Sequence, residues 1–345
     1  MHRRHFLHAT AASAVGLSLT RSRPARAQTP PLVKPKRLSP GDTVAMVAPA
    51  SATFKTVELD VARESLEALG LKVKIGGHLL DRHGYLAGQD KDRADDINRS
   101  FADPVVRAVL PIRGGWGSSR LLPYLDFDAI RRNPKIVLGF SDITALLLSI
   151  HAKTGLVTFH GPNGMGRWDE FSVNWVKQIL FGAQTVTLEN PHDKGEFLVQ
   201  TENRIQTITP GVARGRILGG NLTVLTAIMG SPYLPNFDNG ILFLEDVGED
   251  IYRIDRMMTT LKLAGVLGRI RGFVFGTCSE CEPGQGYGSL TLEEIFNDHI
   301  KPLNVPAWQG AMIGHRQPQF TIAEGIQVEV DASAGRIRML EAAVT

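Results

Sequence analysis

The chain has 345 residues, of which 43% are hydrophobic and 21% charged, and its formal net charge is +3. This length is enough for two ordinary domains with sizeable cores, and the sequence contains no internal repeat or low-complexity tract. Lysines and arginines are interspersed with acidic residues instead of clustered. The composition therefore argues against a nucleic-acid or membrane-surface partner.

The amino terminus has the pattern of a bacterial export signal. Arg3 and Arg4 precede an uncharged stretch over residues 9–20 and an A-x-A cleavage pattern that ends at Ala27. The apolar stretch is far shorter than the roughly 20 residues of a membrane span. We predict a twin-arginine signal peptide over residues 1–27, export to the periplasm, and no stable membrane span. Removing its five arginines changes the net charge from +3 to −2.

Short apolar runs alternate with helical patterns through the first half of the chain. The patterns predict strands over residues 43–50, 71–75, 105–112, 136–140 and 157–160, and helices over residues 57–69 and 91–101. This alternation is typical of an α/β domain with a parallel, helix-flanked sheet, which binds ligands beyond the carboxyl ends of its strands. Residues 48–51, residues 113–117 and Ser141 follow such ends and are expected to share one rim.

The pattern weakens over residues 168–206, which we interpret as an interdomain connection. The second half mixes strands and helices. A strand over residues 215–220 leads into a helix over residues 221–229. A buried strand over residues 241–245, a helix over residues 251–263 and a terminal hairpin beginning at residue 326 follow.

Ser141 lies between an apolar strand and a helix-like segment, in Gly139-Phe140-Ser141-Asp142. At such a junction a side chain points off the end of the sheet, and free N–H groups of the new helical turn can stabilise an oxyanion. Ser141 is therefore a candidate nucleophile.

A nucleophilic serine needs a base, and the base needs an orienting group. His160 and His315 stand out because each lies beside a glycine at an exposed turn or strand end, and Glu245 and Asp246 end a predicted strand. The other candidate bases of the mature chain are His83, His151 and His299, of which the last two lie in predicted helices, and His78 and His192, which lie in loop-like segments. Spacing alone selects no combination.

The two cysteines, Cys278 and Cys281, form a single C-x-x-C. A zinc site would need a second pair of ligands, and a thioredoxin-like centre would open a helix. We interpret the pair as part of a loop with either free thiols or one local disulfide.

An ordered set of motifs over about residues 33–340 resembles the LD-carboxypeptidase family of serine peptidases. The set comprises Val47-Ala48-Pro49-Ala50-Ser51, Leu86-Ala87-Gly88, Arg113-Gly114-Gly115-Trp116-Gly117, Leu138-Gly139-Phe140-Ser141-Asp142, His160-Gly161-Pro162, Gly219-Gly220-Asn221-Leu222, Leu244-Glu245-Asp246-Val247-Gly248-Glu249 and Gly314-His315. The resemblance implies a Rossmann-like nucleophile domain over residues 33–167 and a smaller, swivelling β/α domain over residues 207–341.

The resemblance also implies a Ser-Glu-His triad, in which Ser141 is the nucleophile, His315 the general base and acid, and Glu245 the group that orients His315. The N–H groups of Gly115 and Asp142 would form the oxyanion hole. The chain departs from the family pattern at Arg316, where a small residue is frequent, and over residues 321–325, where a proline-containing turn is frequent. We hypothesise that Arg316 pairs with a substrate carboxylate; the alternative is a solvated or salt-bridged arginine.

The family implies hydrolysis of the bond between an L-configured centre and the terminal D-alanine of a murein tetrapeptide, with no metal or cofactor. A homodimer is a family expectation. Two alternatives remain: a relative that hydrolyses peptidyl-nucleotide antibiotics, for which Trp168 or Trp175 could stack on a base, and an exported murein-peptide binding protein. The case for a phosphate-binding loop over residues 113–119 is weak, because this segment lacks the G-K-[ST] ending of such loops.

Overall fold

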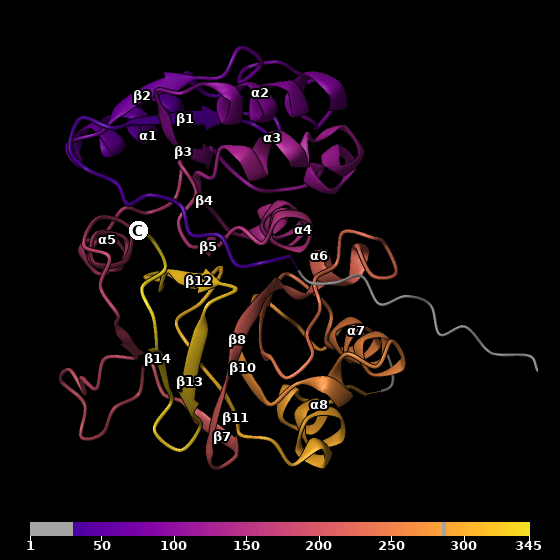
Figure 1. The fold of residues 1–345 in the computed structure, drawn as a ribbon. Coiled ribbons are helices and arrows are strands. Elements are labelled where there is room, and N and C mark those ends of the chain that lie inside the picture. Colours follow the sequence, from indigo (N-terminus) through magenta and orange to yellow (C-terminus); the bar gives the residue numbers. More distant parts are fainter. Residues whose placement is uncertain (1–29, 285–287) are drawn as a thin grey trace, which may run out of the picture.

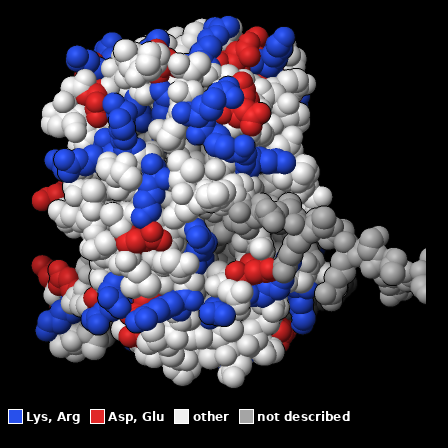
Figure 2. Space-filling model, viewed as in Figure 1, with Lys and Arg blue, Asp and Glu red and all other residues white. Residues whose placement is uncertain are grey.

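The computed structural model describes residues 30–284 and 288–345; the leader predicted over residues 1–27 lies outside the described residues. Two sheets organise these residues, one in each half of the molecule (Figure 1). Within the described ranges, none of the helices has the length and hydropathy that crossing a membrane requires. On the face in Figure 2, basic and acidic side chains lie interspersed over both halves.

The first sheet has six strands in the order β12-β5-β4-β3-β1-β2, and every pair except β5–β12 is parallel. Its sequential elements are β1 Thr43–Val47, α1 Thr56–Ala68, β2 Lys72–Ile75, α2 Asp90–Ala102, β3 Val106–Pro111, α3 Phe127–Arg132, β4 Ile136–Gly139, α4 Thr144–Thr154 and β5 Thr158–His160. Short 3-10 turns lie at Ser118–Tyr124 and Ser141–Ile143. The predicted parallel α/β architecture is confirmed.

Strand order reverses between β1 and β3, because β2 lies outside β1 while β4 and β5 lie beyond β3. In doubly wound sheets such a switch point opens a crevice at the carboxyl ends of the strands. The loops that follow β1, β3 and β4 all begin at this edge of the sheet, and Ser141 lies in the loop after β4.

The second sheet has eight strands in the order β6-β14-β13-β8-β9-β10-β11-β7. The second domain was expected to be the smaller one, but its sheet has more strands than the first sheet. Strands β8 to β11 are parallel, whereas β6, β7, β13 and β14 join antiparallel. The elements are α5 Glu170–Val176, a π-helical turn Lys177–Phe181, β6 Thr187–Glu189, β7 Gln206–Thr209, β8 Val212–Asn221, α6 Leu222–Ala227, β9 Ile241–Val247, α7 Ile251–Leu263, β10 Gly272–Ser279, α8 Leu292–His299, β11 Ala307–Gln309, β13 Gln327–Asp331 and β14 Arg336–Met339, with 3-10 turns at Leu267–Arg269 and Lys301–Leu303.

Helix α4 lies between the two halves of the molecule (Figure 1) and contacts β8 and α6. Most of its side chains are buried, including leucines on successive positions, because protein surrounds it. Thr144, its first residue, accepts a hydrogen bond from the Asn221 N–H at 3.0 Å. Gly220 has φ +123°, and a Cβ there would lie 2.6 Å from the Thr144 hydroxyl, so this close approach requires glycine. The helix that follows Ser141 is thus fixed against the second sheet.

Strand β12, Ile322–Glu324, lies within the range expected for the second domain yet completes the edge of the first sheet by pairing with β5. Glu324 is fully buried there, opposite Thr158 in the register. In the described part of the chain, neither of its carboxylate oxygens has a hydrogen-bond partner. Burial raises the pKa of Glu324 well above its usual range, so the folded protein holds it protonated.

We expect Glu324→Gln to reduce the loss of stability at rising pH. The folded state retains a proton on Glu324 that the unfolded chain releases above about pH 4.3. The contribution of Glu324 to the free energy of unfolding is therefore complete below that pH and is lost as the pH rises through the pKa of the folded state. At pH 8 the variant should have the higher Tm, because an amide binds no proton that rising pH removes. Thermal unfolding at pH 5 and pH 8 tests this, with the exposed Glu293→Gln as the control. Equal pH dependence of Tm in wild type and Glu324→Gln would contradict it.

Cys278 and Cys281 form a local disulfide, one of the two states expected for them. The predicted loop placement is wrong for Cys278, because this residue lies within β10. Cys278 is paired in register with Asp246 of β9. The disulfide therefore closes the turn that follows the strand beside Glu245.

Candidate active site

Ser141 occupies a left-handed backbone conformation, with φ 67°. Such a conformation is uncommon for a residue with a side chain and occurs where the surroundings impose it. The preceding Phe140 N–H donates to the side chain of Asn163 at 3.0 Å, which fixes the turn. A Cβ on Gly114 would lie 2.9 Å from the Ser141 hydroxyl, so glycine is needed where the loop after β3 passes the serine. The sequence thus forms a sharp turn that presents the hydroxyl beyond the sheet.

Three side chains from both halves of the molecule form one hydrogen-bonded chain. The Ser141 hydroxyl lies 3.0 Å from Nε2 of His315, and Nδ1 of His315 lies 2.7 Å from Oε2 of Glu245. The same carboxylate oxygen accepts the His315 backbone N–H at 3.3 Å. With Nδ1 protonated toward Glu245, Nε2 is left to accept the serine proton.

Strand alternation brings Glu245 into this position. Along β9, Ile241 and Phe243 pack in one hydrophobic cluster, whereas Leu242 and Leu244 pack in the other. Glu245 continues the alternation onto the side of Phe243, where it is fully buried. Gly314 has φ +85°, and a Cβ there would lie 2.1 Å from Oε2 of Glu245, so the turn can approach the carboxylate only with glycine.

The surroundings of His315 favour its charged form. Burial opposes the imidazolium, but the hydrogen bond to Glu245 and the charges of Glu245, Asp246 and Glu280 outweigh burial and raise the pKa of His315 above its ordinary value of 6.5. A base of this kind is stabilised when it accepts a proton from the serine. An edge of the Phe140 ring also faces the imidazole, with ring centroids 5.0 Å apart.

The raised pKa of His315 predicts the direction of the pH dependence. Only neutral His315 can accept the serine proton, so kcat/KM should fall about tenfold per pH unit below its pKa, and the acid limb should have its midpoint above pH 6.5. Glu280→Gln removes one contributing charge and should move the midpoint down by about a few tenths of a unit. A pH–rate profile of both proteins measures this, and a wild-type midpoint below 6.5 would contradict it.

Gly115 and Asp142, whose N–H groups are the predicted oxyanion hole, lie on the two loops that meet at Ser141: a Cβ on Gly114 would lie 3.2 Å from the backbone nitrogen of Asp142. Gly115 has φ +109°, and a Cβ there would lie 2.2 Å from the Ser51 hydroxyl. That hydroxyl accepts the Trp116 N–H at 3.1 Å. The Ser118 N–H in turn donates to the Asp142 carboxylate at 2.7 Å, which joins the loop after β3 to the turn of Ser141.

Asp246, next to Glu245, forms hydrogen bonds with the residues at the start of α6. It accepts hydrogen bonds from the side chain of Asn221 at 3.0 Å and from the N–H and hydroxyl of Thr223, at the start of α6. Burial and the adjacent charge of Glu245 raise the pKa of Asp246 to about 6.

Arg316 is half-buried, and its guanidinium donates to the side chain of Asn203.

The other candidate bases lie elsewhere or are unsuited to proton transfer with Ser141. His160 is buried between Phe140 and Phe243, burial lowers its pKa to about 4, and within the described residues neither ring nitrogen has a partner. The remaining histidines pair with other groups: His151 with the Leu156 carbonyl, His192 with Glu189, His299 with Asp255 and His83, through its backbone, with Leu86.

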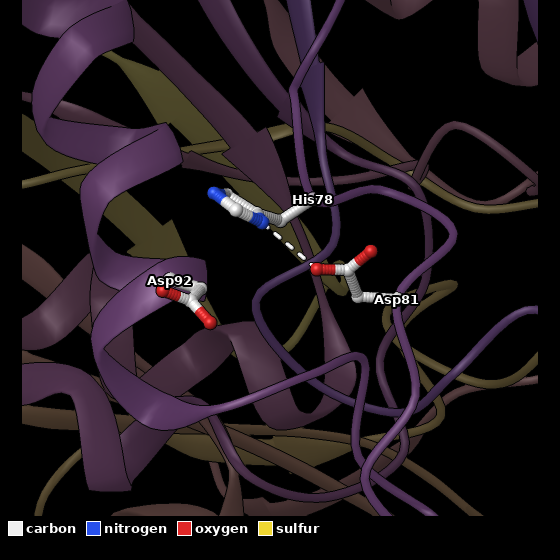
Figure 3. Close-up of side chains that lie close together, drawn as sticks. All are labelled: His78, Asp81 and Asp92. Carbon is white, nitrogen blue, oxygen red and sulfur yellow. Dashed lines mark hydrogen bonds and ion pairs between the residues drawn. The ribbon is translucent and has the colours of Figure 1, made fainter.

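Among the described residues, His78, Asp81 and Asp92 form a group whose donor atoms lie close enough to hold a metal ion (Figure 3). Nδ1 of His78 lies 2.8 Å from the Asp81 carboxylate, and the hydrogen bond to Asp81 raises the pKa of His78. The group lies after β2 and on α2, and it contains none of the residues of the hydrogen-bonded chain. An exposed ion pair accounts for this geometry.

Sequence reasoning did not identify Ser51, Arg93 or Asn163 as individual site residues. Each bonds to the backbone of a distant loop, so its role depends on tertiary contacts. The position of Ser51 just after a predicted strand was the one signal available.

Two family models match this chain: the LD-carboxypeptidase N-terminal domain over residues 44–161 and the LD-carboxypeptidase C-terminal domain over residues 214–330. The chain is 38% identical over 313 residues to a probable murein peptide carboxypeptidase of Bacillus subtilis, covering 90% of this chain and 95% of that protein. It is 30% identical over 291 residues to the murein tetrapeptide carboxypeptidase of Pseudomonas aeruginosa, covering 79% and 87%.

The fold is also similar to a solved structure. The microcin C7 self-immunity protein MccF, without ligand, superposes with a TM-score of 0.81 at 28% identity, covering 91% of this chain and all of that one. The MccF sequence from Escherichia coli is 31% identical over 333 residues, covering 88% of this chain and 94% of that protein.

Proposed function

Because this chain belongs to the LD-carboxypeptidase family, we propose that it is a serine peptidase that hydrolyses the bond between an L-configured centre and the terminal D-alanine of murein tetrapeptides. The observation that carries the proposal is the hydrogen-bonded chain from Ser141 through His315 to Glu245. A neutral serine is a weak nucleophile, and a base at hydrogen-bond distance removes that limitation.

In the acylation step, the Ser141 hydroxyl attacks the carbonyl carbon of the scissile bond while Nε2 of His315 takes its proton. The carbonyl oxygen becomes an oxyanion, which the N–H groups of Gly115 and Asp142 stabilise. Preorganised donors of this kind lower a barrier by about 3 kcal/mol each. His315 then gives the proton to the leaving nitrogen, D-alanine departs, and the tripeptide remains as an ester on Ser141.

In the deacylation step, water enters the position vacated by D-alanine. His315 takes a proton from the water, whose oxygen attacks the ester carbonyl and forms a second oxyanion in the same hole. Collapse of this intermediate breaks the bond to Ser141, and His315 returns the proton to the serine oxygen. The tripeptide leaves with a free carboxylate. Glu245 stabilises the imidazolium in both steps.

We assign Arg316 to the terminal carboxylate of the substrate. It lies next to His315 in sequence, and a guanidinium retains further donors when one nitrogen bonds to Asn203. Arg316→Ala should raise KM about tenfold with little change in kcat. Steady-state kinetics on the tetrapeptide measure this, and an unchanged KM would contradict the assignment.

Export to the periplasm is part of the proposal and rests on the twin-arginine pattern of residues 1–27. The proposed substrate fits that location, because murein lies outside the cytoplasmic membrane. A homodimer remains a family expectation.

The test incubates the purified protein with L-Ala-γ-D-Glu-meso-diaminopimelate-D-Ala and with the same peptide ending in L-alanine, and measures released alanine by mass spectrometry. The proposal predicts release from the first peptide and little from the second. One solved MccF structure contains aspartyl sulfamoyl adenosine. Release from neither peptide, together with hydrolysis of that compound, would overturn the proposal in favour of the alternative, a peptidyl-nucleotide hydrolase. Tight peptide binding without turnover would instead indicate a binding protein.

A further inference from the structure

One arginine is fully buried beside the site and takes no part in the reaction described above. Arg93 lies on α2, and its side chain has no exposed surface, whereas Arg99 on the same helix is 69% exposed. Arginine is almost never buried in this way unless it is paired. Its contacts therefore indicate what the buried charge holds in place.

The Arg93 guanidinium joins two loops and one carboxylate. Nη1 donates to the carbonyl of Pro49 and, at 3.2 Å, to the carbonyl of Gly117, while Nη2 donates to the Asp90 carboxylate at 2.5 Å. Asp90 also accepts two hydrogen bonds from Arg120, each 3.0 Å long. The negative charge of Asp90 compensates the buried cation, so both loop carbonyls can be bound by a charged donor.

Both loops belong to the rim of the site. Pro49 lies in the loop after β1, two residues before Ser51, whose hydroxyl accepts the Trp116 N–H. Gly117 ends the loop after β3 that contains Gly115. Gly117 has φ +126°, and a Cβ there would lie 2.5 Å from Cδ2 of Leu86 and 2.8 Å from Nη1 of Arg93, so the backbone passes close to both side chains. Ser51 and Arg93 thus hold the loop on either side of Trp116.

We propose that Arg93 is a positioning residue that directs the Gly115 N–H toward the oxyanion, an inference that rests on the proposed acyl transfer at Ser141. The donor lies in a glycine-rich segment outside the sheet, so hydrogen bonds to neighbouring loops must set its direction. A displacement of about 1 Å at a reacting centre can lower a rate roughly 100-fold. Arg93 acts through the loop and touches no reacting atom.

The test replaces Arg93 by lysine and by alanine, with Arg99→Lys on the same helix as the matched control. Lysine keeps the charge beside Asp90 but lacks the planar fork that reaches Asp90 and both carbonyls together. We expect kcat for D-alanine release to fall about tenfold in Arg93→Lys and about 100-fold in Arg93→Ala, with KM changed less than about threefold. Added guanidinium should partly restore Arg93→Ala, and Arg99→Lys should match the wild type.

A second measurement tests the role of Arg93 independently of whether the substrate is a murein peptide. A small fluorophosphonate forms a P–O bond to Ser141 and releases fluoride, and its phosphoryl oxygen uses the same donors without requiring a murein peptide. Labelling of Ser141 should slow in Arg93→Lys by the same factor as kcat. A wild type that is labelled but releases no D-alanine would contradict the proposed function alone. Equal labelling rates of wild type and Arg93→Lys, in proteins with equal Tm, would overturn the role of Arg93.

Discussion

Replacing His315 with alanine is expected to lower kcat for D-alanine release by about 10⁴-fold or more. Nε2 of His315 lies 3.0 Å from the Ser141 hydroxyl, and in the proposed mechanism both chemical steps pass a proton through this nitrogen. KM should change little, because the imidazole interacts with the substrate mainly in the transition state. Steady-state kinetics by mass spectrometry measure the effect.

His192→Ala is the matched control, because His192 also pairs with a glutamate, Glu189, at 2.7 Å. It should keep wild-type kinetics. Less than a tenfold loss in His315→Ala would contradict the role of His315 and would turn attention to water or another base. Partial restoration by added imidazole would support it, since the cavity left by alanine admits a free base.

Glu245→Gln is the second change with a very large expected effect, a loss of kcat of up to about 10⁴-fold. The carboxylate accepts both the ring N–H and the backbone N–H of His315 through one oxygen. An amide can present its NH₂ group to Nδ1 instead, which reverses the tautomer and turns Nε2 into a donor. It also removes the charge that stabilises the imidazolium, so the residual acid limb should move to lower pH.

The thermal stability of Glu245→Gln should equal or exceed that of the wild type. Glu245 is fully buried, and in the described structure its Oε1 has no hydrogen-bond partner, so the neutral amide removes a costly buried charge. Loss of activity with an undiminished Tm would show that the carboxylate serves chemistry and not folding. Retained activity, or an acid limb at unchanged pH, would contradict its role as the orienting group.

The periodicity of apolar residues was sufficient to predict the helices and strands that have one buried side. The predicted helix over residues 251–263 coincides with α7, whose apolar residues face the core at helical spacing. The terminal hairpin is likewise present as β13 and β14. The predicted parallel sheet is confirmed. Its inner strands β1, β3 and β4 are largely apolar, because α1 packs on one face and α2 and α4 pack on the other, whereas the edge strand β2 alternates lysines with apolar residues and is mostly exposed.

Elements whose partners lie far away in the sequence could not be predicted in this way. Strand β12 has three residues and pairs with β5, which precedes it by more than 160 residues. A segment this short carries no measurable alternation, and its buried Glu324 suggests a loop. The first sheet therefore gains an edge strand that local patterns do not reveal.

The site divides in a similar way. Ser141 was a candidate from its strand-to-helix junction alone, whereas the choice of Glu245 and His315 depended on the family resemblance. The structure brings these three side chains within hydrogen-bond distance, and their catalytic roles stay predictions. Arg93 was not predicted, because its position within a charged amphipathic helix resembles that of a solvated arginine.

The most direct test of the account compares wild type and Ser141→Ala on L-Ala-γ-D-Glu-meso-diaminopimelate-D-Ala, with tripeptide and D-alanine followed by mass spectrometry. The account predicts that wild type forms both products and that Ser141→Ala forms them at least about 10⁴-fold more slowly while still binding the peptide. Tripeptide formation at comparable rates by both proteins would contradict it, because the reaction would then not pass through an ester on Ser141.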